Sequence, residues 1–154
     1  MKKYLNLMVA VMLATICLGL GACGDDNDEP DSGNAKDLIG TWENDLAKAA
    51  VSTGWYETCE SFIQFRKDGT VVSVDAYIYT DEYAELFGEK EEIEVTYGTW
   101  HTEGNEVYYE GEDGVTEVNT FKVKGKTLTM TTTSGVIVSV TFTKVSDSRI
   151  NKYL

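Results

Sequence analysis

The stretch CESFIQFRKDGTVVSVDAYIYT, residues 59–80, decides the fold class of this chain. It contains two runs rich in β-branched and aromatic residues, and the break Lys67-Asp68-Gly69 separates them. Side chains of Val, Ile, Thr, Tyr and Phe suit the pleated, half-buried surface of a sheet. Asp-Gly tolerates the positive φ that a tight hairpin turn needs. The stretch is therefore predicted to form a β-hairpin.

The same pattern recurs on both sides of this hairpin. Further glycine turns separate the runs, at Gly104-Asn105, Glu112-Asp113-Gly114, Lys124-Gly125-Lys126 and Ser134-Gly135. We predict eight strands, at 38–43, 59–66, 70–80, 92–102, 106–111, 115–123, 127–133 and 136–144. A sandwich or a barrel would bury one face of each strand. Because hairpins join successive strands, we expect an all-β, eight-stranded antiparallel up-and-down barrel, in which closure removes both sheet edges.

Alternation along the strands predicts which side chains face the interior of the barrel. The predicted inward set is Ser61, Ile63, Phe65, Val72, Val74, Ala76, Ile78, Ile93, Val95, Tyr97, Leu128, Met130, Val136, Val138, Val140 and Phe142. The opposite faces are rich in Thr, Ser, Lys, Glu and Tyr. An interior of this kind either encloses one small ligand or is filled by its own side chains, and alternation leaves both open.

Two segments interrupt the strand pattern. Residues 45–58 contain three alanines, and we expect a short helix with Asp45 as its N-cap and Gly54 at its end. Residues 81–88 are predicted to form a second short helix that ends at Gly88. We expect both to be short helical caps at the barrel ends, either as lids or as packed covers.

The N-terminus has the pattern of a bacterial export signal. Lys2 and Lys3 precede an apolar run at 7–22, which is shorter than the roughly 20 residues that span a bilayer. Leu20-Gly21-Ala22-Cys23 resembles the lipobox of bacterial lipoproteins, and this resemblance implies cleavage after residue 22 and lipidation of Cys23. We interpret residues 1–22 as a cleaved lipoprotein signal peptide, with an uncleaved membrane anchor as the alternative.

Residues 23–36 are interpreted as the lipidated Cys23 and an acidic, flexible tether, and residues 37–154 as the barrel domain. The segment GDDNDEPDSGN, 24–34, is acidic and lacks large apolar side chains. An acidic cluster directly after the lipidated cysteine resembles the surface-export signal of Bacteroidota lipoproteins. That resemblance implies an outer-membrane protein anchored by lipid and exposed at the cell surface. A linker facing the periplasm is the alternative.

Several short motifs resemble those of a known family. Gly40-Thr41-Trp42 resembles the Gly-x-Trp signature of lipocalins, in which the Trp closes the barrel floor. Four further stretches are similar to the small lipocalin-like domains of Bacteroidota lipoproteins: FRKDGT at 65–70, YGTW at 97–100, LTM at 128–130 and TFTKV at 141–145. The resemblance covers 38–145 and implies a lipocalin-like barrel with Trp42 as its floor. An Arg commonly packs over this Trp in lipocalins, whereas this chain has Lys144.

Charge and composition argue against several classes of site. The chain has 13 Lys and Arg against 26 Asp and Glu, a formal net charge of −13, which would repel nucleic acid. One His cannot complete a zinc site with one domain Cys. The acidic groups at 81–94 and 110–113 lack the spacing of a calcium loop, so we interpret them as solvated faces, with a calcium site as the alternative. No metal and no cofactor is expected.

No catalytic motif is present in the sequence. The chain lacks a Gly-x-Ser-x-Gly elbow, a phosphate-binding loop and a dinucleotide fingerprint. Once Cys17 leaves with the leader and Cys23 is lipidated, Cys59 is alone, and nothing in the sequence connects it to His101. We interpret Cys59 as a small buried strand residue rather than a nucleophile, and the domain as non-catalytic.

The barrel interior is the remaining candidate site. We expect a lipid-anchored, non-catalytic module that binds a small apolar or amphipathic ligand in this interior. The predicted ligand contacts are Phe65, Ile78, Tyr97, Tyr109 and Met130. The alternative is a filled core whose outward aromatic residues bind an envelope protein or a glycan. The predicted partner surface consists of Trp55, Tyr77 and Tyr79.

Overall fold

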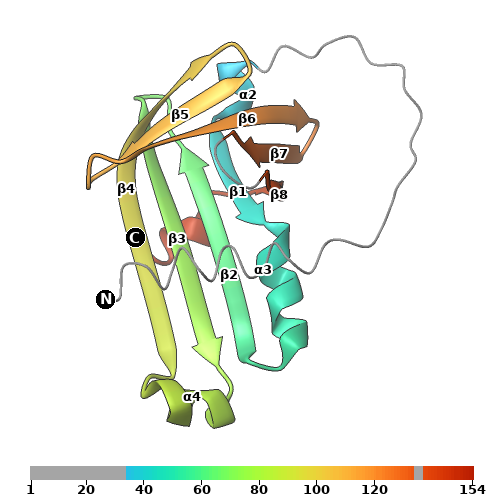
Figure 1. The fold of residues 1–154 in the computed structure, drawn as a ribbon, viewed down its shortest axis with the longest axis vertical. Helices are drawn as coiled ribbons and strands as arrows, with labels where there is room; N and C mark the ends of the chain where they lie inside the picture. The colour runs from blue at the N-terminus through green and yellow to red at the C-terminus, as the bar shows by residue number, and fades with distance from the viewer. Residues whose placement is uncertain (1–33, 134–136) are drawn as a thin grey trace, which may run out of the picture. The chain divides into compact units, whose positions relative to one another are not determined.

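Eight antiparallel strands form a closed barrel in the computed structural model of the protein, which describes residues 34–133 and 137–154 (Figure 1). The strands are β1 (Gly40–Asn44), β2 (Tyr56–Phe65), β3 (Thr70–Tyr79), β4 (Glu91–Glu103), β5 (Glu106–Gly111), β6 (Thr116–Lys124), β7 (Thr127–Thr132) and β8 (Ser139–Val145). Each pairs with its neighbours in sequence, and β1 pairs with β8. The predicted all-β, eight-stranded antiparallel barrel is confirmed.

Short helices accompany the barrel. They are α2 (Ala35–Leu38), α3 (Asp45–Ala50), the 3-10 helix η2 (Val51–Thr53), α4 (Asp81–Phe87) and α5 (Ser148–Asn151). The two predicted helical caps correspond to α3 with η2 and to α4, whereas α2 and α5 were not predicted. The predicted signal peptide, Cys23 and the tether up to residue 33 lie outside the described residues.

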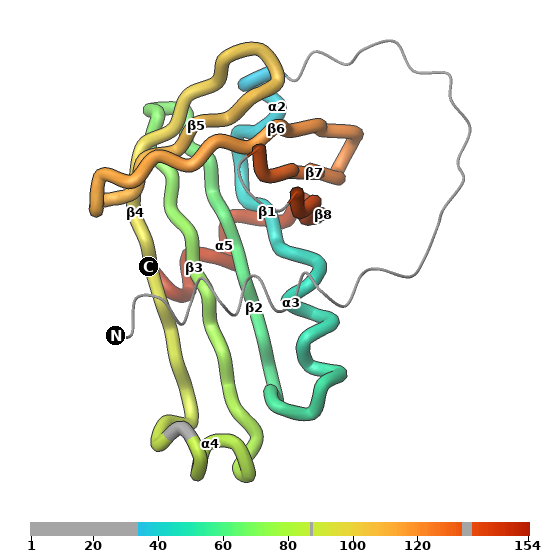
Figure 2. Tube along the Cα trace, in the orientation of Figure 1, coloured from blue at the N-terminus to red at the C-terminus, as the bar shows by residue number. Residues whose placement is uncertain are grey.

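Strands β2, β3 and β4 extend beyond the closed section of the barrel. β1 pairs only with residues 62–65 of β2, and β5 pairs only with residues 98–103 of β4. The remaining lengths of the three strands pair with one another alone and run to α4, as the tube in Figure 2 shows. We call residues 56–61, 73–79 and 91–97 the three-stranded extension. The interior therefore has two parts: a closed section walled by all eight strands, and a part walled by β2, β3 and β4 alone.

Two apolar clusters lie on opposite sides of the sheet. The first combines residues from α2 and from strands all around the barrel, so it lies inside: Leu38, Trp42, Phe65, Val71, Val107, Phe121, Leu128 and Met130. We call it the barrel core. The second combines β2 and β3 with α5: Phe62, Val72, Val74, Ala76 and Ile150. It lies on the outer face, where the C-terminal segment covers the sheet.

The predicted inward face is wrong for β3 and β4. Phe65 in the barrel core pairs with Val71, which pairs with Gly98, so these positions share the inner face. Counting in steps of two from Val71 and Gly98 gives the other inward positions of β3 and β4. The residues predicted to face inward from these two strands therefore lie on the outer face: Val72, Val74, Ala76, Ile78, Ile93, Val95 and Tyr97. The apolar side of β3 points outward because α5 buries it, and periodicity alone cannot tell two covered faces apart.

The inward faces of the other strands agree with the prediction. Ile63, Leu128, Met130 and Phe142 belong to the barrel core or pack against it, and Val140 pairs with Met130. Val136 lies outside the described residues.

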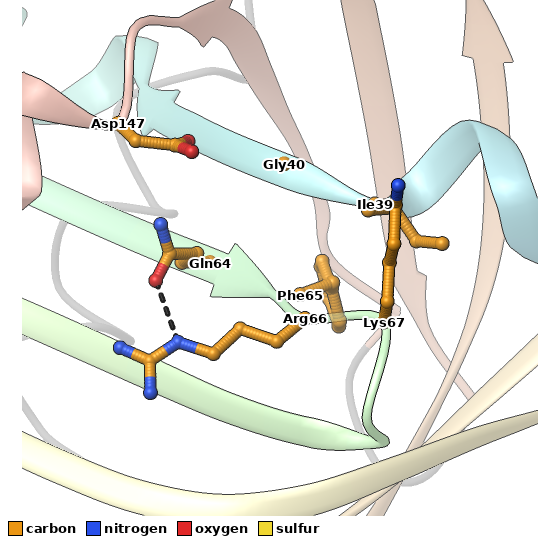
Figure 3. Close-up of a pocket in the computed structure, with 7 residues that line it drawn as sticks. All are labelled: Ile39, Gly40, Gln64, Phe65, Arg66, Lys67 and Asp147. Atoms are coloured by element: carbon orange, nitrogen blue, oxygen red, sulfur yellow. Dashed lines mark hydrogen bonds between the residues drawn. The ribbon is translucent and has the colours of Figure 1, made fainter.

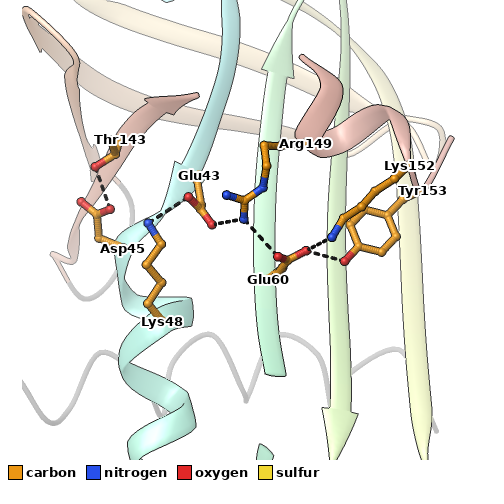
Figure 4. Close-up of polar contacts among 8 residues, drawn as sticks. All are labelled: Glu43, Asp45, Lys48, Glu60, Thr143, Arg149, Lys152 and Tyr153. Atoms are coloured by element: carbon orange, nitrogen blue, oxygen red, sulfur yellow. Dashed lines mark hydrogen bonds and ion pairs between the residues drawn. The ribbon is translucent and has the colours of Figure 1, made fainter. Parts of the chain in front are cut away.

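Ion pairs attach the C-terminal segment to the outer face (Figure 4). Arg149 places its Nη2 2.8 Å from Glu43 Oε1 and 3.0 Å from Glu60 Oε1. Lys152 Nζ lies 2.6 Å from Glu60 Oε2, and the hydroxyl of Tyr153 donates to the same oxygen. α5 has only four residues, which is too few for a helical pattern to be recognised in the sequence.

The caps of the helices follow local chemistry. Asn44, rather than the predicted Asp45, is the N-cap of α3, and its side-chain oxygen accepts from the Leu46 N–H at 2.9 Å. Gly54 and Gly88 end η2 and α4 with φ of +82° and +78°, as predicted. α3 contacts β2 and β8 and has two buried alanines, so it is a packed cover.

Candidate functional site

Side chains fill the closed section of the barrel. Trp42 is fully buried in the barrel core next to α2, and its Nε1 donates to the carbonyl oxygen of Leu38 at 2.6 Å. Phe65 and Leu128 are buried beside it, from different walls of the barrel. Because these side chains meet in one cluster, the closed section is packed with the protein's own residues.

The interior of the three-stranded extension is polar instead. The residues that share the inner face there, by register with Phe65 and Val71, are Cys59, Ser61, Ser73, Asp75, Tyr77, Tyr79, Glu92, Glu94 and Thr96. We call this set, together with Tyr56 opposite Tyr79, the polar inner face. Glu94 and Thr96 are exposed, so solvent reaches this part of the interior.

Three tyrosines gather at the far end of the polar inner face. The ring centroid of Tyr56 lies 5.5 Å from that of Tyr77 and 5.3 Å from that of Tyr79. The Tyr79 hydroxyl donates to Glu92 Oε2 at 2.9 Å, which holds that ring in place. Burial raises the pKa of all three phenols, and the charge of Glu92 adds to the effect. The three hydroxyls therefore stay protonated at neutral pH.

Asp75 is the central carboxyl of the polar inner face. It pairs in register with Ser61 on one side and Glu94 on the other. Burial raises the pKa of Asp75, the charge of Glu94 raises it further, and a hydrogen bond from Ser61 opposes both effects. A hydrogen bond from a polar ligand would stabilise a buried carboxyl of this kind.

Cys59 lies buried next to this carboxyl. Burial, Asp75 and Glu60 together raise the pKa of its thiol to about 12. His101 is exposed and stacks on Tyr108 with ring centroids 4.9 Å apart. Cys59 pairs with Tyr77, and Tyr77 pairs with Glu92 on β4. His101 lies nine residues further along β4 than Glu92, which is about 30 Å at the rise of a strand. Cys59 and His101 therefore do not meet.

The structure separates the five predicted ligand contacts. Phe65 and Met130 lie in the barrel core and Tyr109 packs against it. Burial raises the pKa of Tyr109, and Glu117 adds to this. Ile78 and Tyr97 were expected inside but lie on the outer face, where Tyr97 is 44% exposed. Their strands carry the reversed face described above.

The predicted partner surface also divides. Trp55 is 45% exposed, as a surface residue would be. Tyr77 and Tyr79, which were expected outside, belong to the polar inner face, because Tyr77 pairs with Cys59 and Glu92. Sequence reasoning missed Tyr56, Asp75 and Glu92 as candidate site residues. The alternating polar series Ser73, Asp75, Tyr77 was the available signal, but it reads as a solvent face unless the outer cover is known.

An open pocket of about 320 Å³ lies on the outside, where β1 meets the end of β2 (Figure 3). Arg66 and Lys67 line it together with Gln64 and Asp147. Arg66 Nε donates to Gln64 Oε1 at 2.8 Å, and Asp147 accepts from Thr41 at 2.7 Å. Gln64, Arg66 and Asp147 thus already have hydrogen-bond partners within the protein, and the pocket opens on the surface of the barrel rather than its interior.

In the described part of the chain, no group of three or more His, Cys, Asp and Glu side chains is arranged to hold a metal ion. No helix among residues 34–133 and 137–154 is long and apolar enough to cross a membrane. Comparison of the chain with protein-family models, with curated proteins and with solved structures finds no match.

Proposed function

We propose that the protein is a non-catalytic binding module that holds a small amphipathic ligand against its polar inner face. The observation that carries this proposal is the contrast between the two parts of the interior. The closed section is packed with apolar side chains, whereas the extension turns tyrosine rings and a buried carboxyl toward solvent-accessible space. Binding sites commonly combine apolar surface with a few placed polar groups.

The inner-face chemistry favours a ligand with an apolar body and a hydroxyl or amine group. The rings of Tyr56 and Tyr77 offer flat apolar surface. Their neutral hydroxyls donate and accept hydrogen bonds, and Asp75 accepts one more. The raised pKa of Cys59 keeps this side chain as the protonated thiol, which is a much poorer nucleophile than the thiolate. This supports a binding role for the site over a nucleophilic one.

We also propose that the domain is a lipocalin-like barrel anchored by lipid at Cys23 in the outer membrane and exposed at the cell surface. The lipobox and the acidic tether support the anchoring, and the sequential closed barrel with a buried Trp42 supports the family resemblance. In the producing cells, Cys23→Ala should abolish labelling by an alkyne-tagged palmitate and release the protein from the membrane fraction. Retained labelling would contradict lipidation at this residue.

Native mass spectrometry tests the ligand site. Residues 24–154, incubated with an extract of the producing cells and their medium, should carry a stoichiometric added mass. Tyr77→Ala should remove this mass, and Tyr97→Ala should retain it, because Tyr97 is the same residue type on the outer face. Far-UV circular dichroism checks that both variants fold. If no added mass appears, or if Tyr97→Ala is the variant that loses it, the proposed site is wrong.

A further inference from the structure

We propose that the far end of the three-stranded extension binds a protein segment that carries an apolar side chain flanked by Lys or Arg. Two stretches form this end, residues 51–55 with η2, and α4 with Gly88. We call them together the tip. The tip lies outside the polar inner face, so this inference is independent of the proposed small ligand.

The tip exposes large apolar side chains. Leu86 on α4 is 74% exposed, Trp55 is 45% exposed and Val51 is 37% exposed. Single exposed apolar residues are ordinary, but three on two adjoining segments mark a surface that gains from being covered. In the barrel and on its outer face, by contrast, α2 and α5 each bury a large apolar residue, Leu38 and Ile150.

Several contacts hold the two stretches of the tip and their flanking residues together. The rings of Trp55 and Tyr83 stack with centroids 5.2 Å apart and an interplanar angle of 26°. The N–H of Thr80 donates to the carbonyl oxygen of Trp55 at 3.0 Å. Lys90 Nζ lies 2.7 Å from both Glu57 and Asp81. A surface that is already ordered loses less conformational entropy when a partner binds.

The charges around the tip specify the partner. Lys90 is paired with two acids, and Asp81 remains 95% exposed. The other exposed carboxylates on α4 and the segment that follows it are Glu82, Glu85, Glu89 and Glu91. A partner with Lys or Arg around an apolar side chain complements these carboxylates, whereas nucleic acid and anionic lipid are repelled.

The place of the tip makes it accessible. The chain enters the barrel through α2, beside the last residues of β2, and the tip adjoins the first residues of that strand (Figure 2). The ten residues of β2 separate the two ends by about 30 Å. If Cys23 is lipidated, as proposed above, the tether attaches at the end opposite the tip.

An NMR titration of residues 24–154 tests the proposal. The probes are a 14-residue amphipathic Leu-Lys peptide and a Ser-Lys peptide of equal charge. We expect the Leu-Lys peptide to shift amide resonances of residues 51–55 and 81–88 most strongly, and to bind at least tenfold more tightly than the Ser-Lys peptide. Equal affinities, or shifts spread over all acidic surfaces, would show unspecific charge attraction and overturn the proposal.

Variants localise the effect. Leu86→Ser and Trp55→Ser should each weaken binding of the Leu-Lys peptide roughly tenfold, and Leu86 is so exposed that its replacement leaves the fold intact. Val115→Ser is the matched control, because Val115 is 57% exposed beside acids in the β5–β6 turn. Loss of binding in this control contradicts the proposal. If raising the protein concentration alone shifts the tip resonances, the tip binds a second copy of the chain. If maltoheptaose shifts them, the tip binds a glycan. Either result would overturn the proposal.

Discussion

Lys144 of β8 lies over the indole of Trp42 in β1, with its Nζ 4.9 Å from the ring centroid. The two residues are register partners across the strand pair that closes the barrel. Gly40 leaves room for this contact, because a Cβ there would lie 3.0 Å from Lys144 Cε, and its φ is +126°. The ammonium group of Lys144 thus lies over a ring that belongs to the barrel core.

Lys144→Met should lower the free energy of unfolding by about 0.5 to 1 kcal/mol, because it keeps the apolar stem and removes the cation from the ring face. Lys144→Arg should retain the stability, since a guanidinium also stacks on an indole. Urea denaturation followed by Trp fluorescence measures both. Equal stability of the Met variant and the natural protein would show that the charge contributes nothing here.

Gly98→Ala should destabilise the barrel by about 2 to 3 kcal/mol, because an added Cβ would lie 2.3 Å from the carbonyl oxygen of Glu110. Gly104 is the control. It has φ of +63° with no atom near the added Cβ, so Gly104→Asn should be nearly neutral while Gly98→Asn is worse than Gly98→Ala. Thermal melting ranks the three variants, and a different order would contradict the close approach of β4 and β5.

Ile150→Ala should cost about 2 to 4 kcal/mol of unfolding free energy, because Ile150 is fully buried against the outer face of β2 and β3. Ile137→Ala is the control, since Ile137 is 79% exposed and its replacement should change little. Denaturant midpoints measure both. If Ile150→Ala were as mild as the control, the C-terminal segment would not form a second core.

Asp75 should make stability depend on pH. Burial, with Glu94 adding to it, raises the folded-state pKa of Asp75 above its unfolded value of about 3.9. The folded state therefore binds the proton more tightly, and its stability falls as pH rises from about 4 through the raised pKa. Asp75→Asn removes this loss. Melting temperatures from pH 3 to 8 should show the variant gaining on the natural protein as pH rises, and parallel curves would contradict the raised pKa.

Cys59 should react slowly with thiol reagents. With its pKa raised to about 12 by burial and nearby carboxylates, its thiolate fraction at pH 8 is roughly a thousandfold below that of a free cysteine. Ellman's reagent should modify it rapidly only after unfolding in guanidinium. Asp75→Asn should speed the native reaction, because the Asp75 charge contributes to the raised pKa. Fast labelling of the folded natural protein would restore the nucleophile interpretation.

Local chemistry made the strands and turns predictable. The runs of β-branched residues and the Asp-Gly and Gly-Asn turns depend on short-range preferences, so these hairpins were found at their places. The predicted turn at Ser134-Gly135 lies outside the described residues. The ends of η2 and α4 were also predictable, because Gly54 and Gly88 adopt positive φ there. The N-cap of α3 was misplaced by one residue, since Asn44 and Asp45 are both good caps.

The amino-acid sequence by itself determined the hairpins, their order and the acidic surface, because each depends on neighbours along the chain. The direction in which β3 and β4 turn their side chains depended on a contact between Val74 and the segment around Ile150, far apart in sequence. That contact put Asp75 and Tyr77 inside and Tyr97 outside. β3 has no exposed residue on either face, so periodicity could not reveal which of its faces is the interior, and the packing of α5 on the sheet set the chemistry of that interior.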